Sequence, residues 1–246
     1  MIIGPSNGWL FRKKVYSLAE QEALFKKAGA NCVEFSFLSE WNIAENRKRT
    51  HSLRNSQGFN PRIFIHRSVH LPDIIGQETE QEFSMVQKVI SCCKTAVALT
   101  HPLKSGGDYP IKSYEMMIKR GVPLAIENMD IRKDSGFDLK ELEKLLTVVG
   151  CFVLDVQHAF EYDPTMEYAF DLFEMAKTRL AYLHVSGETP DRRHALTFQS
   201  RNCDQIVSFL GTIFSEIQVP IILEGEYSTS EEFLENLKSD FFSHRV

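Results

Sequence analysis

Short apolar runs alternate with longer segments of mixed polarity along nearly the whole chain. The runs are rich in Val, Ile, Leu and Phe, a composition typical of β-strands that are buried on both faces. They predict eight strands, at residues 2–3, 32–37, 62–70, 96–100, 122–126, 151–154, 180–185 and 219–223. Strands of this kind form parallel sheets, which need a long crossover connection between one strand and the next.

The segments between the runs have the length and the periodicity of helices. In residues 78–94, for example, Phe83, Val86 and Val89 fall on one side. The pattern predicts helices at residues 18–28, 39–60 with a looser tail, 78–94, 112–120, 139–148, 165–178, 204–217 and 230–239. Gly29 and Gly121 directly follow two of these helices, and glycine is a common helix stop.

Eight successive βα units predict an α/β protein with one (β/α)8 TIM barrel that occupies residues 1–246 as a single domain. The length of 246 residues suits such a barrel, and the composition has no break that would mark a second domain. An open, doubly wound sheet is the alternative. The chain has no GxGxxG or GxxxxGK motif that would support nucleotide binding by a sheet of that type.

The composition is that of an ordinary soluble globular protein. No run of about 18 apolar residues predicts a transmembrane helix, and the N-terminus lacks the layout of a signal peptide, so we expect a cytoplasmic protein without a membrane partner. The five cysteines show no CxxC spacing, which favours buried thiols over a disulfide or zinc knuckle. The net charge of −5 gives no overall attraction for nucleic acid, although a local basic strip could supply it.

Six consecutive predicted strands end at residues that can bind a metal ion. These residues are His70, His101, Glu127, Asp155, His184 and Glu224, and His158 follows three positions after Asp155. In a barrel the carboxyl ends of the strands lie around one rim, so the side chains are expected to converge on one pocket. Carboxylates brought together in this way would repel one another unless a cation lay between them. The pattern therefore predicts a divalent metal site.

Each of these residues also has a simpler interpretation. Asp155 could cap the helix that follows it, His70 could be a hydrogen-bonded core imidazole, and Glu224 could pair with an arginine. It is the recurrence of the arrangement on six strands that favours the metal site.

The residues suggest how the ligands could be divided. A mixed set of carboxylates and one imidazole suits zinc, with manganese or iron as alternatives, and this set is Glu127, Asp155, His184 and Glu224. His70 and His101 could extend it to a second ion, with Glu127 as the bridge. A further group could form after the seventh strand from Asp191 and His194 together with His158. Alternatively, Arg192 and Arg193 make that segment a solvated, charged loop.

The strand-end segments SVHLP, LTHP, AIEN, LDVQHAF, LHVSGETPDRRH and ILEG resemble the xylose isomerase-like TIM barrels. Within that superfamily they are most similar to endonuclease IV, the metal-dependent apurinic/apyrimidinic endonucleases. The resemblance extends from about residue 70 to residue 224. It implies one zinc ion on His70 and His101 and a second on Asp155 and His184, with Glu127 bridging the two and Glu224 serving the same centre. It implies a third zinc ion on His158, Asp191 and His194.

The resemblance leads us to expect a hydrolase that cleaves phosphodiester bonds at abasic sites in DNA, with the ions stabilising the attacking and leaving oxygens. The alternative is a sugar isomerase or epimerase with one ion, in which Glu127 and Glu224 move protons between adjacent carbons of a small sugar or sugar phosphate. A non-catalytic barrel that binds a ligand is a third possibility. The candidate substrate-binding residues are Glu34, Arg192 and Arg193.

Two groups of residues have both a functional and a structural interpretation. The aromatic residues Trp9, Phe11, Phe35 and Trp41 could stack on a sugar, although core packing is the commoner reason for such residues. The basic residues Lys13, Lys14, Arg47, Lys48, Arg49 and Arg54 could follow a phosphate backbone, or they could form a solvated surface.

Overall fold

Eight parallel strands form a nearly closed barrel in the computed structural model, which describes residues 1–12, 18–37, 64–71 and 80–238. The strands are β1 Ile3–Pro5, β2 Cys32–Ser36, β3 His66–His70, β4 Val97–Thr100, β5 Leu124–Glu127, β6 Cys151–Asp155, β7 Leu180–Val185 and β10 Ile221–Leu223. They are hydrogen-bonded in the order β1-β10-β7-β6-β5-β4-β3-β2. The predicted barrel is confirmed, and each of its strands overlaps one of the predicted runs.

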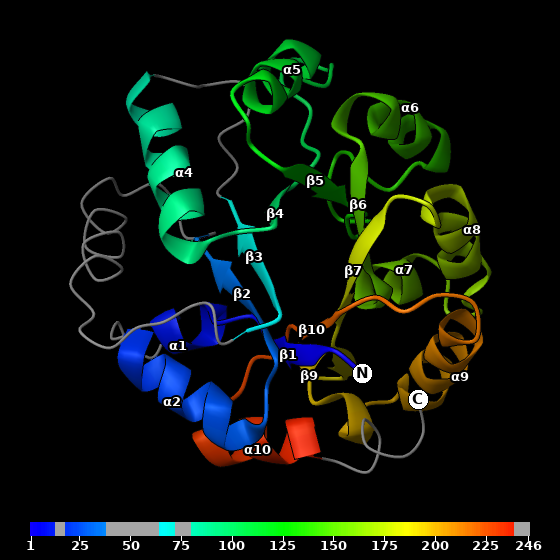
Figure 1. The fold of residues 1–246 in the computed structure, drawn as a ribbon. Coiled ribbons are helices and arrows are strands. Elements are labelled where there is room, and N and C mark those ends of the chain that lie inside the picture. The colour runs from blue at the N-terminus through cyan, green and yellow to red at the C-terminus, as the bar shows by residue number, and fades with distance from the viewer. Residues whose placement is uncertain (13–17, 38–63, 72–79, 239–246) are drawn as a thin grey trace.

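Helices surround the ring of strands (Figure 1). They are α1 Gly8–Arg12, α2 Leu18–Ala28, α4 Glu80–Cys93, α5 Ile111–Lys119, α6 Leu139–Val149, α7 Val156–Tyr162, α8 Glu167–Ala176, α9 Cys203–Phe214 and α10 Ser230–Lys238, with a 3-10 turn at Thr197–Gln199. The helix predicted at residues 39–60 lies outside the described residues, as do Trp41 and the six basic residues considered above. Within the described ranges, no helix is long and apolar enough to cross a membrane.

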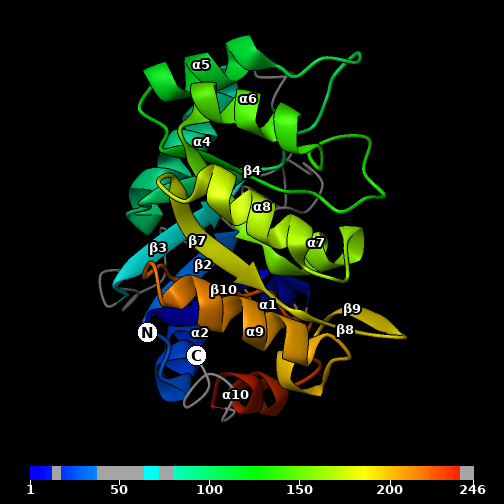
Figure 2. The same ribbon diagram turned by 90° about the vertical axis from the view of Figure 1, so that its right-hand side faces the viewer.

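Two features at the carboxyl ends of the strands were not predicted from the pattern. The helix α7 starts directly after β6, and β8 Gly187–Thr189 pairs with β9 Arg192–Ala195 in an antiparallel hairpin. Figure 2 shows this hairpin extending beyond the end of β7. The helix α7 was missed because the polar residues Asp155, Gln157 and His158 end the apolar run and its 7 residues are too few to show a helical period. The hairpin strands are too short and polar to give an alternating pattern.

Most strands contribute one or two inward-facing apolar side chains to the interior of the barrel. These side chains form a separate cluster, which comprises Cys32, Val97, Leu99, Ala125, Val153, Tyr182 and Ile222. The outward-facing residues pack with the helices in a larger cluster that includes Trp9 and Phe35, so these two aromatic residues are part of the core. Because side chains alternate along a strand, on four strands the inward position two residues after an interior residue lies at the rim of the barrel. For Ala125, Val153, Tyr182 and Ile222 these positions are Glu127, Asp155, His184 and Glu224.

The first strand closes the barrel against β2 through a close backbone approach. Asn31 N donates to Ile3 O at 3.0 Å, Asn7 N donates to Glu34 O at 3.0 Å, and Ser6 forms a parallel bridge with Glu34. Between these contacts, a Cβ atom on Gly4 would lie only 1.8 Å from the backbone oxygen of Cys32. There is therefore no room for a side chain at position 4, and the barrel requires glycine there.

We expect Gly4→Ala to destabilise the fold by about 3 kcal/mol, because the added methyl group must push backbone away from backbone and open the seam between β1 and β2. Thermal or denaturant unfolding measures the change. The matched control is Gly211→Ala in α9, where a Cβ atom meets nothing within 4 Å. That change should leave stability the same or raise it by about 0.5–1 kcal/mol. Equal effects at the two positions would contradict the seam's dependence on Gly4.

Candidate metal centre

Six strands bring the predicted metal ligands to one rim of the barrel. His70, Glu127, Asp155 and His184 belong to β3, β5, β6 and β7, while His101 follows β4 and Glu224 follows β10. The first four are buried, whereas the side chains of His101 and Glu224 are 13% and 20% exposed. The structure therefore gathers at one site the residues that the sequence placed at six separate strand ends.

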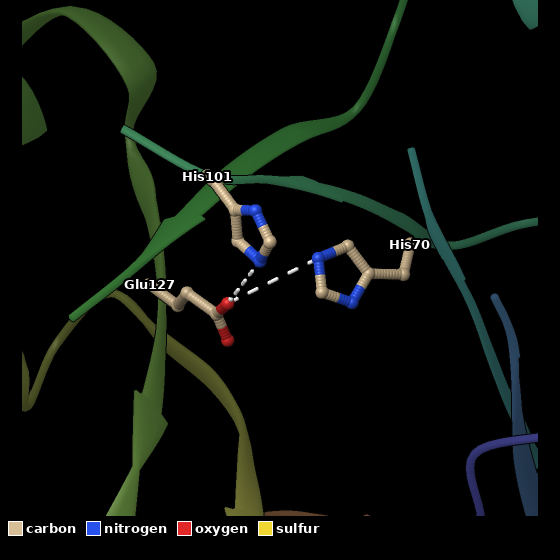
Figure 3. Close-up of side chains that lie close together, drawn as sticks. All are labelled: His70, His101 and Glu127. Carbon is tan, nitrogen blue, oxygen red and sulfur yellow. Dashed lines mark ion pairs between the residues drawn. The ribbon is translucent and has the colours of Figure 1, made fainter. Parts of the chain in front are cut away.

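His70, His101 and Glu127 form one group of three potential ligands (Figure 3). His101 Nε2 lies 3.0 Å from Glu127 Oε1, and His70 Nε2 lies 3.9 Å from the same oxygen. Both imidazole rings point toward this carboxylate, and their centroids are 4.8 Å apart. The ligand atoms of the group all lie within 4.8 Å of one another.

A second group consists of Glu127, Asp155 and His184. His184 Nδ1 is 3.0 Å from Glu127 Oε2 and 3.4 Å from Glu224 Oε2. The two oxygens of Glu127 therefore face different imidazoles, with Oε1 toward His101 and Oε2 toward His184. This arrangement fits the bridging position expected for Glu127.

Several buried polar atoms at the site have no hydrogen-bond partner among the described residues. They are both ring nitrogens of His70, Glu34 Oε1 and Asp155 Oδ2. Leaving such atoms unpaired is costly unless something else satisfies them. Imidazole nitrogens and carboxylate oxygens are ligands of zinc, manganese and iron, so the residues present fit a divalent metal ion.

The close packing of carboxylates changes their ionisation in the metal-free protein. Burial raises the pKa of Glu224 to about 8, and the neighbouring Asp155 and Glu127 carboxylates also raise it, whereas His184 acts in the opposite direction. Burial alone would also raise the pKa of Glu127, but hydrogen bonds from His101 and His184 hold that pKa well below its usual value. Burial would lower the pKa of His184, yet Glu34 and Glu224 outweigh this effect and raise it.

Asp155 serves both the helix that follows it and the candidate site. Its Oδ1 caps α7 by accepting from His158 N at 2.9 Å, so the capping interpretation of the sequence is correct for this oxygen. Its backbone is fixed by the Asn128 side chain, which accepts from Asp155 N at 2.8 Å and donates to Asp155 O at 2.9 Å. The other oxygen, Oδ2, remains directed at the site and lies 3.3 Å from His158 Nδ1.

The proposed third group is only partly assembled. The rings of His158 and His194 are 6.1 Å apart, and His194 Nδ1 lies 3.0 Å from Ser186 Oγ. Asp191 is exposed at the turn of the β8–β9 hairpin and belongs to no group of three ligands found in the described part of the chain.

The two arginines of the hairpin have different surroundings. Arg192 donates to Glu226 O at 3.0 Å and to Ser228 Oγ at 3.1 Å, which ties the hairpin to the segment after β10. Arg193 instead faces a pocket of about 220 Å³, which is lined by Ile131, Arg132, Phe160, Glu161, Pro164, Glu188, Arg193 and Arg201. The lining residues come from the segments that follow β5, β6 and β7, so the pocket lies at the same end of the barrel as the candidate metal centre.

Three residues at the site were given no metal-site role from the sequence. Glu34, expected to bind substrate, is fully buried and forms a further group of potential ligands with His70 and Glu224. Tyr182 donates its hydroxyl to Glu34 Oε2 at 2.7 Å, and Asn128 holds Asp155 as described. The sequence could have indicated Tyr182, because it lies two positions before His184 on the same strand and must face the same way.

No protein-family model matches the sequence, and no curated protein sequence matches it significantly. Solved structures do match it. A xylose isomerase domain containing protein from Salmonella typhimurium is 14% identical with a TM-score of 0.67, and the match covers 96% of this chain and 94% of that one. The chain therefore has the xylose isomerase-like TIM-barrel fold.

Two other matches represent two chemistries. Endonuclease IV from Thermus thermophilus is 18% identical with a TM-score of 0.62, and the match covers 93% of this chain and 94% of that chain. A D-tagatose 3-epimerase-like protein is 13% identical with a TM-score of 0.64, and that match covers 99% and 97% of the two chains. Identities this low show the fold alone, so the choice between the two chemistries must come from the site.

We expect metal binding by the metal-free protein to release more protons at about pH 6.5 than at about pH 8.5. With a pKa of about 8, Glu224 carries a proton at the lower pH and has largely lost it at the higher pH. The difference should be about 0.7 proton per chain. Calorimetric zinc titrations in buffers of different ionisation enthalpy measure the release. Equal release at both values would show that Glu224 is already ionised before the ion binds.

Proposed function

We propose that the protein is a metal-dependent hydrolase of phosphodiester bonds with a centre for two ions. The convergence of His70 and His101 on Glu127 Oε1, while His184 faces Oε2, carries this proposal. A one-ion centre would need only the second group of ligands together with Glu224. The additional imidazoles are useful if Glu127 bridges two ions.

Two ions held here would stabilise both the attacking and the leaving oxygen of an in-line displacement at phosphorus. The protein itself would hold the metal ligands in fixed positions, and hydrogen bonds to Asp155 do this for one of them. Asn128 holds the backbone of Asp155 through two hydrogen bonds, and α7 fixes one oxygen of its carboxylate. A ligand set held in this way keeps the reacting groups in place without further reorganisation.

The pocket beside the centre supports an anionic substrate. Arg132, Arg193 and Arg201 line it, and each of their side chains is at least 45% exposed. Arg132 pairs with Asp130 and Glu161, and Arg201 pairs with Glu188, which leaves Arg193 as the main cation for a substrate. Arg193 has a long contact of 3.9 Å to Glu161, so its guanidinium is available for a phosphate group. DNA with an abasic site is the first substrate to test, because endonuclease IV is among the structural neighbours. The overall charge of −5 means that such binding would depend on this local group of arginines.

A sugar isomerase or epimerase is the second candidate. It is favoured by the four ligands Glu127, Asp155, His184 and Glu224, which would suffice for one ion. An epimerase-like protein also shares the fold. The number of bound ions separates the two candidates.

Glu127→Gln should reduce hydrolysis by at least about 100-fold and lower the bound metal content, because an amide cannot bridge two ions as a carboxylate does. Activity and metal analysis on the same preparation provide the measurement. The control is Glu216→Gln, which alters an exposed ion pair with Lys177 far from the rim. Full activity and full metal content in Glu127→Gln would remove the proposal.

We expect metal-loaded protein to cut a duplex oligonucleotide on the 5′ side of a single abasic site, and a chelator to stop the cutting. Gel analysis of a labelled strand, with an intact duplex as control, measures this. Absence of cleavage together with one tightly bound ion per chain would favour the isomerase or epimerase and direct the next assays to ketoses and sugar phosphates.

A further inference from the structure

We infer that Glu34 is a positioning residue that orients the histidines on both sides of the metal centre. The inference rests on the proposed two-ion centre and adds a role for a side chain that was expected to bind substrate. Glu34 is completely buried in the barrel interior. Its carboxylate faces a ring nitrogen of His184 and a ring nitrogen of His70.

The two nitrogens of His184 have different partners. Nε2 lies 2.9 Å from Glu34 Oε2, whereas Nδ1 faces Glu127 at 3.0 Å and Glu224 at 3.4 Å. A metal-binding histidine commonly donates its other N–H group to a carboxylate, which fixes the tautomer and the direction of the ring. The geometry assigns Nε2–H to Glu34 and leaves Nδ1 for the ion.

His70 has a corresponding arrangement with the nitrogens exchanged. Its Nδ1 lies 3.7 Å from Glu34 Oε1, and its Nε2 lies 3.9 Å from Glu127 Oε1. Both distances are too long for hydrogen bonds, which is why these atoms are unpaired. A small rotation of the ring as Nε2 takes up an ion would bring Nδ1–H to Glu34 Oε1. Glu34 thus faces His184 Nε2 and His70 Nδ1, whereas Glu127 faces the other nitrogen of each ring.

The depth of Glu34 in the barrel supports a positioning role over direct binding of substrate. Glu34 pairs in register with Ser68, whereas His70 pairs with Ser36, so Glu34 belongs to a layer below the histidine. Tyr182 belongs to the same lower layer, two residues before His184, and its hydroxyl donates to Glu34 Oε2 at 2.7 Å. With both Tyr182 and His184 donating to it, Oε2 is fully engaged, and the carboxylate is held beneath the centre.

The first test compares zinc binding by the wild type and by Glu34→Gln, which keeps the shape of the side chain and removes its charge. We expect both proteins to bind two ions, with the affinity for each lowered about 10–100-fold in Glu34→Gln. Competition with a chromophoric chelator gives affinities and stoichiometry. Tyr182→Phe should shift affinity in the same direction by a smaller factor, because it removes one of the two donors that fix the carboxylate. The control is Glu216→Gln, which should bind as the wild type does.

The visible absorption of the cobalt-substituted proteins provides a readout that a general loss of stability would not move. We expect Glu34→Gln to change the position or intensity of the cobalt bands while thermal unfolding of the metal-free variant shows that it is folded. Wild-type affinity for both ions in Glu34→Gln would overturn the inference. Loss of one ion with unchanged affinity for the other would also overturn it, since Glu34 would then be a ligand. A wild type that binds no ion would instead refute the proposed function together with the inference.

Discussion

The crowding of four carboxylates, three of them buried, in one space is the constraint on which the rest of the site depends. Glu34, Glu127, Asp155 and Glu224 meet at the carboxyl end of the barrel, where their mutual repulsion would be severe without positive charge. In the metal-free protein, protons and imidazoles supply that charge, as the raised pKa values of His184 and Glu224 indicate. A metal ion bound here would therefore compete with protons for the same space.

The barrel places Glu127, Asp155 and Glu224 at one rim, with Glu34 in the layer below. Inward-facing positions alternate along each strand, so apolar side chains such as Ala125 and Val153 fill the interior while the next inward positions carry Glu127 and Asp155. Closure of the barrel at Gly4 fixes the distance between β1 and β2 and hence the position of Glu34. Both layers are thus defined by strand register, which depends on the whole ring.

The sequence predicted the barrel and the strand-end ligands because both depend on local patterns. Buried parallel strands have continuous apolar runs, and a polar residue such as Glu127 at the end of a run is easily recognised. The sequence could not show that Glu34 lies one layer below His70, because that depends on the register between β2 and β3. It also could not show how Asp155 divides its oxygens between a helix and the site, because the pattern does not reveal the short helix α7 that begins directly after Asp155.

That division of oxygens links the metal centre to the pocket beside it. The helix α7 begins at the cap formed by Asp155 Oδ1 and carries Phe160 and Glu161, which line the pocket. A molecule that shifted α7 on filling the pocket would also turn the carboxyl group of Asp155, whose other oxygen faces the candidate site. Occupation of the pocket and occupation of the metal centre are then thermodynamically linked, and each changes the affinity of the other by the same factor. A single aspartate at the start of that helix would then transmit the state of one cavity to another.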